Sequence, residues 1–172
     1  GALAAQGRGD EALQFATQLT AEQQAKAGGL DRLRGTAEAA QARQAEAQGA
    51  LGRARSLFEE ALVSNPDDPW LRLDLARIYV RQGAVGTARS MMDGLLASHP
   101  DMVDALYAGA LASMEQRHFE QARAFLARLT PLVAADAPAA RLANLLAAEV
   151  AWNAGDAPRV LTLVNPAAPG RP

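Results

Sequence analysis

The strongest constraint on the fold is a spacing of 34 residues between two similar segments. Residues 70–100 are predicted to form two helices, with a turn at Gly83 and a stop at Pro100. Small and apolar positions recur 34 residues further on, where Ala76 is matched by Ala110. A short helix pair cannot bury its apolar face alone, so repeated pairs stack on one another. The spacing therefore predicts an all-α array of helix pairs.

The residues at the repeating positions resemble the tetratricopeptide repeat. Its large apolar, small, aromatic, Gly, Ala and Pro positions are filled here by Leu75, Ala76, Tyr79, Gly83, Ala88 and Pro100. The resemblance implies a right-handed α-solenoid, a superhelix of about four helix-turn-helix units plus a partial N-terminal unit. The third unit departs from the motif, since Arg117 stands where the second unit has Gly83.

The repeat register predicts boundaries along the whole chain. A partial repeat at 1–19 and an irregular connection or hinge at 20–34 precede full repeats at 35–68, 69–102 and 103–140. The last of these carries a short insertion near Pro131, and a degenerate repeat at 141–165 and a flexible tail at 166–172 follow. The partial first repeat suggests an excised fragment. Met92 is expected inside a second helix, and residues 36–48 could instead form a coiled-coil arm, although they lack a heptad of large apolar residues.

Composition and charge limit the classes of function that the chain can have. Ala is the most frequent residue and only 5% of residues are aromatic, as suits closely packed helices. A net charge of −2 gives no electrostatic footprint for nucleic acid or a membrane surface. No cysteine is available for a disulfide, a thiolate metal site or a nucleophile, which fits a cytosol or a periplasm. No apolar run reaches 18 residues, so we expect no direct membrane insertion.

Residues that could carry chemistry are few. His99 and His118 are expected in turns without partners at metal-ligand spacing. The acidic pair Glu59 and Glu60 falls on a helix surface, and Asp68 with its neighbour suits helix capping. We therefore expect no enzyme, no cofactor and no metal.

A narrower resemblance rests on residues 65–79, with Gln82 and Gly83, and on residues 104–108. These segments resemble the periplasmic repeat region of the C component of bacterial cellulose synthase. That family takes part in the synthesis and export of a β-1,4-glucan. The resemblance implies a periplasmic scaffold without catalytic activity.

The repeat family binds ligands on the concave face of the first helix of each unit. Carried onto this chain, the groove or partner-binding residues are Arg43, Glu46, Trp70, Arg77, Arg81, Tyr107, Met114, Glu149, Trp152 and Asn153. Leu73, Leu111, Glu115, Leu142 and Leu145 are assigned to the same face. Arg43 and Arg77 stand where chaperone-binding members have Asn, so capture of a chaperone tail by its carboxylate is not expected. The aromatic residues could stack on sugar rings or on partner side chains, or pack between repeats.

Three functions fit these residues. The first is a periplasmic scaffold of an exopolysaccharide export complex, which binds other protein subunits in its groove and has β-1,4-glucan as a second candidate ligand. The second is a stand-alone cytosolic adaptor that binds a short peptide of a partner. The third is a repeat domain attached to an enzyme. A homodimer through the exposed end repeat is a further alternative.

Overall fold

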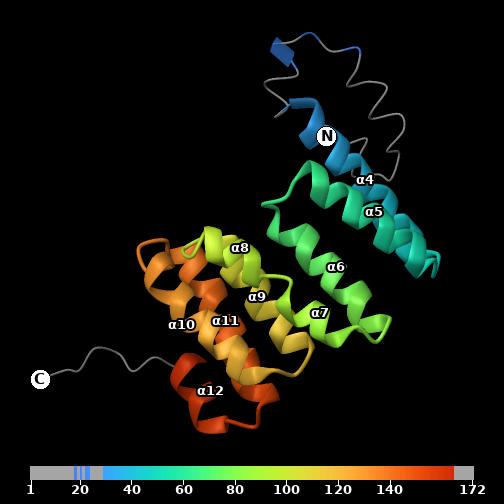
Figure 1. Cartoon of the computed structure of the whole chain (residues 1–172). Coiled ribbons are helices and arrows are strands. Elements are labelled where there is room, and N and C mark those ends of the chain that lie inside the picture. The colour runs from blue at the N-terminus through green and yellow to red at the C-terminus, as the bar shows by residue number, and fades with distance from the viewer. Residues whose placement is uncertain (1–17, 19, 21, 24–28, 165–172) are drawn as a thin grey trace, which may run out of the picture. The chain divides into compact units, whose positions relative to one another are not determined.

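The computed structural model describes residues 18, 20, 22, 23 and 29–164, and Figure 1 labels its helices. The chain divides into two compact units, Gly1–Ala88 and Arg89–Pro172. Helices form the regular structure of both units, and the part of the chain that is described contains no strand. The predicted all-α fold of helix pairs is confirmed.

Unit 1 contains the helices α4 (Gly29–Ala47), α5 (Leu51–Ser64) and α6 (Pro69–Arg81), and α7 (Val85–Ser90) begins in it. Helix α5 packs on both α4 and α6. A three-residue turn joins α4 to α5, which makes the pair antiparallel (Figure 1). Residues 36–48 thus lie mostly in a helix that packs on its neighbour, and the coiled-coil alternative is wrong.

Alanine forms the packing face of α4. Ala37 and Ala42 are fully buried, and so is Phe58 on the neighbouring helix α5. The helices also meet closely at one end, where a Cβ on Gly35 would lie 3.1 Å from the Cβ of Ser64 and would overlap the amide of Asn65. Small residues therefore let an otherwise polar helix pack tightly.

Helix α6 begins at a strong N-cap. The Asp68 carboxylate accepts hydrogen bonds from the backbone N–H groups of Trp70 and Leu71, at 2.9 and 3.1 Å. Pro69 occupies the first helical position, where its fixed φ suits the helix and no N–H is lost. The cap fixes where α6 begins and therefore the position of Trp70 in its first turn.

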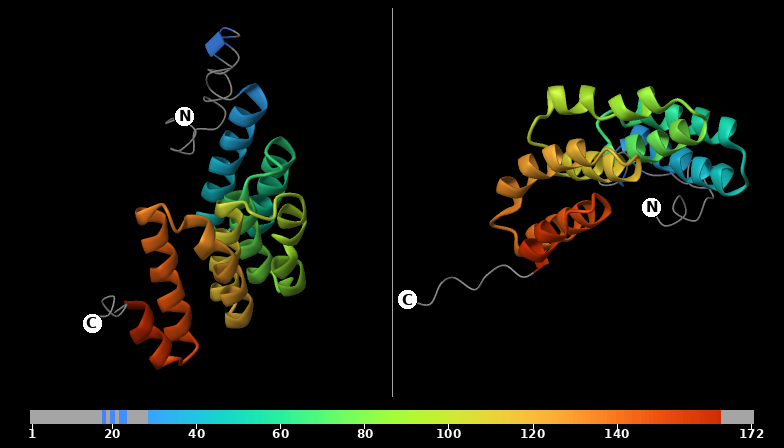
Figure 2. Two further views of the ribbon diagram at one scale, coloured as in Figure 1. Left: turned by 90° about the vertical axis from the view of Figure 1, so that its left-hand side faces the viewer. Right: turned by 90° about the horizontal axis from the view of Figure 1, so that it is seen from below.

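Unit 2 continues the pattern of neighbouring helices. It contains α8 (Asp93–Ser98), α9 (Val103–Glu115), α10 (Phe119–Val133), α11 (Ala137–Asn153) and α12 (Ala157–Val164). Each helix packs on the next in the chain, and α9 also contacts α11, as the two views of Figure 2 allow the reader to follow. Leu106, Leu129 and Val150 are among the largest fully buried side chains of this core.

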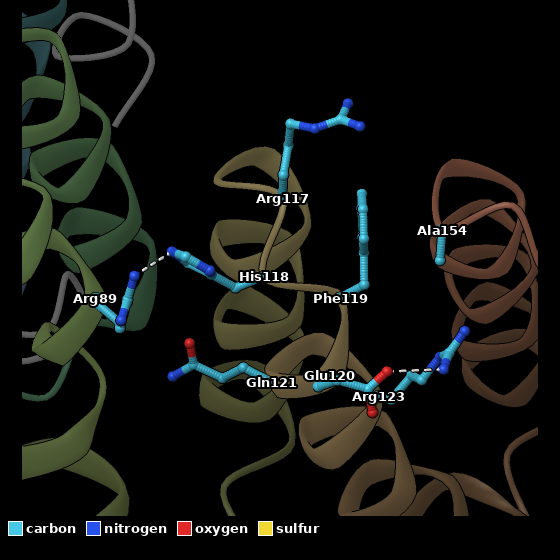
Figure 3. Close-up of a pocket in the computed structure, with 8 residues that line it drawn as sticks. All are labelled: Arg89, Arg117, His118, Phe119, Glu120, Gln121, Arg123 and Ala154. Carbon is cyan, nitrogen blue, oxygen red and sulfur yellow. Dashed lines mark hydrogen bonds and ion pairs between the residues drawn. The ribbon is translucent and has the colours of Figure 1, made fainter.

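The turns within the helix pairs share a left-handed residue. It is Gly49, Gly83 and Gly155 in three pairs, with φ of 76°, 82° and 76°. In the α9–α10 pair the residue is Arg117, with φ of 62° (Figure 3). A side chain at such a φ costs about 1–2 kcal/mol that glycine avoids. Arg117 is thus a strained exception among the described residues.

Several expectations need correction. Helix α4 begins at Gly29, so residues 29–34 are helical and do not belong to an irregular connection. Met92 lies in a turn between α7 and α8, beside residues of low helix propensity, although it is buried as a core residue should be. Pro131 lies inside α10, and α11 begins at Ala137, four residues before the expected repeat boundary. Apart from residue 18, the predicted partial repeat at 1–19 and the tail at 166–172 lie outside the described residues.

Candidate functional site

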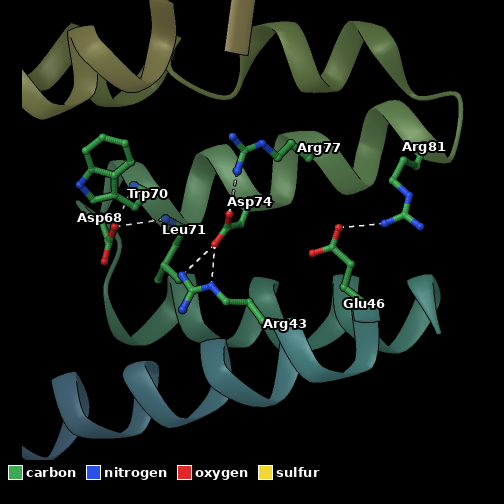
Figure 4. A network of polar contacts seen from close by, with 8 residues as sticks. All are labelled: Arg43, Glu46, Asp68, Trp70, Leu71, Asp74, Arg77 and Arg81. Atoms are coloured by element: carbon green, nitrogen blue, oxygen red, sulfur yellow. Dashed lines mark hydrogen bonds and ion pairs between the residues drawn. The ribbon is translucent and has the colours of Figure 1, made fainter. Parts of the chain in front are cut away.

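The candidate site of unit 1 is a set of ion pairs that joins α4 to α6, the first helices of two successive pairs (Figure 4). Arg43 on α4 donates to Asp74 Oδ2 through Nε at 3.0 Å and through Nη2 at 2.8 Å. Arg77 donates to the other carboxylate oxygen of Asp74 at 3.3 Å. Further along, Arg81 donates to Glu46 Oε1 at 2.8 Å. We call Arg43, Glu46, Trp70, Arg77 and Arg81, together with Asp74, the first-helix face.

The charges of this face largely cancel. Asp74 lies between two arginines and its side chain is 17% exposed, whereas those of Arg43 and Arg77 are 54% and 42% exposed. Exposed ion pairs of this kind are worth about 0–1 kcal/mol each. They can therefore open at little cost and exchange partners with the polar groups of a bound molecule.

Trp70 gives the first-helix face its aromatic residue. It is 39% exposed, so part of its surface packs against the protein and part faces outward. Figure 4 shows it at the start of α6, two turns from Arg77. Leu73, which the sequence assigned to the same face, is instead 3% exposed and belongs to the core. That assignment was wrong because α6 is buried on two sides, and Leu73 lies with Pro69 and Ala76 on the side opposite Leu71 and Leu75.

In unit 2 the sequence-assigned residues lie on α9 and α11. Tyr107 and Met114 on α9 are half-buried, while Glu149, Trp152 and Asn153 on α11 are exposed. Trp152 is 71% exposed. Asn153 Nδ2 donates to the backbone carbonyl of Glu149 at 2.9 Å, which uses part of its hydrogen-bonding capacity within the helix.

The groups with shifted pKa values do not lie on the first-helix face. Burial raises the pKa of Tyr79, and the carboxylate of Glu59, which accepts the phenol hydrogen bond at 2.8 Å, raises it further. Burial and the nearby Glu60 raise the pKa of Glu38. Both shifts follow from packing among helices. No cluster of three metal-ligating side chains occurs in residues 29–164 or at the four other described positions.

Asp74 is the residue of this face that sequence reasoning missed. Its signal in the sequence is its place one helical turn before Arg77, on α6, the first helix of the pair that follows α4 and α5. Its role is indirect, since it holds two arginines from a more buried position than either of them has. Repeat positions indicate the groups that face a ligand, and they do not indicate an acid that supports such groups.

Residues 45–114 match the family model described as tetratricopeptide repeat. This segment therefore consists of tetratricopeptide repeats, a fold that serves in general as a non-catalytic scaffold for binding proteins. A crystal structure of nearly identical TPR-like repeats of a kinesin light chain from Podospora anserina is similar in fold. It aligns with a TM-score of 0.59 and 19% identity, over 96% of this chain and 87% of that one.

Two curated relatives are similar to this chain over most of its length. The chain is 42% identical over 124 residues to cellulose synthase operon protein C of Xanthomonas axonopodis pv. citri (strain 306). It is 32% identical over 127 residues to the protein of the same name from Pseudomonas fluorescens (strain SBW25). These alignments cover 72% and 74% of this chain but only 8% and 10% of the relatives. The chain thus corresponds to a small part of each relative.

Proposed function

We propose that this chain is part of a periplasmic scaffold in a bacterial complex that synthesises and exports cellulose or a related exopolysaccharide. The observation that carries the proposal is the similarity to two proteins named for the cellulose synthase operon, over nearly three quarters of the chain. The scaffold binds other protein subunits and does not itself catalyse a reaction.

The first-helix face supplies the binding surface. Its arginines are half-exposed and paired with more buried acids, and Trp70 offers a flat apolar surface beside them. Interfaces commonly place an aromatic or arginine anchor among polar groups that can re-pair. A partner segment with both apolar and charged side chains suits this surface.

The proposed scaffold differs from the two alternatives, a cytosolic adaptor and a domain attached to an enzyme, in its partners and its compartment. A cytosolic adaptor would bind a short peptide in the cytoplasm, and a domain attached to an enzyme would contact that enzyme.

None of the described helices has the length and apolar character needed to cross a bilayer.

Cross-linking in cells tests the scaffold. A photoreactive amino acid replaces Arg77 in the protein in its native host, and an equivalent replacement of exposed Arg53 on α5 serves as the control. We expect light-dependent cross-links from position 77 to subunits of the exopolysaccharide complex, and few from position 53. Cross-links only to cytoplasmic proteins would contradict both the partner class and the compartment.

A second candidate ligand is the glucan itself. Trp70 and Trp152 are exposed aromatic residues on first helices, and such rings stack on sugar faces. Titration with cellohexaose, followed by tryptophan fluorescence and amide NMR shifts, tests this role. Shifts at these residues that disappear in Trp70→Ala or Trp152→Ala support glucan binding. Unchanged spectra at millimolar sugar would contradict glucan binding, and protein binding would remain as the proposed function.

A further inference from the structure

A pocket in unit 2 lies at the turn between α9 and α10, and none of the residues assigned to ligand binding lines it. Its volume is about 550 Å³, and its lining includes Arg89, Arg117, His118, Phe119 and Arg123. Figure 3 shows Arg89 reaching toward His118, with Arg117 and Phe119 beyond it. The volume falls within the range of small-ligand sites, about 300–1,000 Å³.

Arg117 is held in this pocket by a strained backbone. It takes a left-handed φ of 62° at the position that glycine fills in the three other turns. Its guanidinium carbon lies 5.4 Å from the centre of the Phe119 ring, which orients the cation at the pocket. Strain of this kind collects at functional sites, where a particular side chain must be presented. A structural turn alone would be served better by glycine.

Arg89 and Arg117 carry charges that no carboxylate offsets among the described residues. Arg89 Nη2 lies 2.6 Å from His118 Nε2, and guanidinium can only donate in such a contact. Arg123 differs from both, since it pairs with Glu120 at 2.9 Å and with Asp156 at 3.3 Å. The pocket thus presents two uncompensated cations beside one compensated one.

From this arrangement we infer that the pocket at the α9–α10 turn binds a carboxylate of an acidic peptide segment in a partner protein. Guanidinium groups bind carboxylates with two parallel hydrogen bonds, and an aromatic ring beside them accepts the apolar part of the peptide. Glu120 and Asp156 already pair with Arg123, so the pocket offers two arginines for one carboxylate and no long basic track for a polyphosphate backbone. The inference concerns a second surface, and it stands whether or not the first-helix face binds glucan.

The test uses the whole chain and an acetylated, amidated hexaglutamate peptide, with hexaglutamine as the neutral control. Binding is measured by calorimetry and by amide NMR shifts. Arg117→Gly and Arg89→Ala are the pocket variants, and Arg53→Ala removes the same charge from an exposed position outside the pocket. We expect each pocket variant to weaken hexaglutamate binding about tenfold or more, as loss of a charge-assisted pair does, and Arg53→Ala to change it less than twofold.

Arg117→Gly also guards against a trivial loss of binding through unfolding. Glycine relieves the left-handed strain, so this variant should melt no lower than the parent chain. Equal weakening by Arg53→Ala would show only general charge attraction and would overturn the inference. Absence of hexaglutamate binding at millimolar peptide would overturn it too. Inorganic phosphate bound as tightly as the peptide, with the same arginine dependence, would show a general oxyanion site and contradict the peptide assignment.

Discussion

Two glycines three residues apart should respond in opposite directions to the same substitution. Gly83 lies in the turn just after α6 with φ of 82°, whereas Gly86 lies in α7 and has no such φ. A Cβ added at either position would meet nothing within 4 Å, so packing contributes to neither effect. The two substitutions therefore isolate the backbone.

The magnitudes follow from the two conformations. Alanine in place of Gly83 would have to adopt the left-handed conformation, which costs about 1–2 kcal/mol of folding free energy. It regains about 0.4–1 kcal/mol because the unfolded chain loses freedom, so Gly83→Ala should destabilise by about 1 kcal/mol. Alanine at Gly86 gains helix propensity, worth up to about 1 kcal/mol in a helix interior and about half of that near the start of so short a helix.

Thermal and urea unfolding, followed by circular dichroism, measure the difference. A total of about 1.5 kcal/mol corresponds to melting temperatures about 3–6 °C apart for a chain of this size, with Gly86→Ala the higher. Shifts of the same sign in the two variants would refute the reasoning, since they would show that backbone conformation does not decide either effect.

Three further substitutions have expected outcomes. Phe58→Ala should lower the free energy of unfolding by about 3–5 kcal/mol because the side chain is fully buried, as urea unfolding would show. Asp68→Ala should cost about 1 kcal/mol through loss of the α6 N-cap, and an unchanged melting temperature would contradict this. Glu38 has a pKa raised above its ordinary value of 4.5, so the folded chain binds this proton more tightly than the unfolded chain does. Its contribution to stability falls as pH rises through that pKa, and Glu38→Gln should raise stability at neutral pH while leaving it unchanged near pH 3.

The fold could be predicted because its signal is local and repeated. Ala76 and Gly83 recur at a fixed spacing, and each needs only its own turn or helix pair to explain it. In the first helix of the predicted 35–68 unit, Ala42 and Ala45 are buried as packing residues of α4, although α4 begins at Gly29, before the predicted boundary. Exact helix ends were less predictable, as the break at Met92 shows, because small propensity differences are decided by packing.

The site was only partly predictable, for a physical reason. Repeat positions indicate which residues lie on first helices, but not which partners they find across helices. Asp74 is distant in sequence from Arg43, and only the folded chain brings them within 2.8 Å. Arg89 and His118 meet in the same way, across 29 residues. The unusual Arg117 was visible in the sequence as a missing glycine, yet its φ and its ring contact came from the structure.

The most direct test of the proposed scaffold is cellulose output from a host in which the native gene carries changes in this segment. Arg77→Ala combined with Arg81→Ala alters the first-helix face, and Arg53→Ala combined with Arg159→Ala removes the same charge elsewhere. With both proteins present at normal levels, we predict a several-fold loss of secreted cellulose for the first pair and near-normal output for the second. Equal output from the two would contradict a role for the first-helix face in the complex.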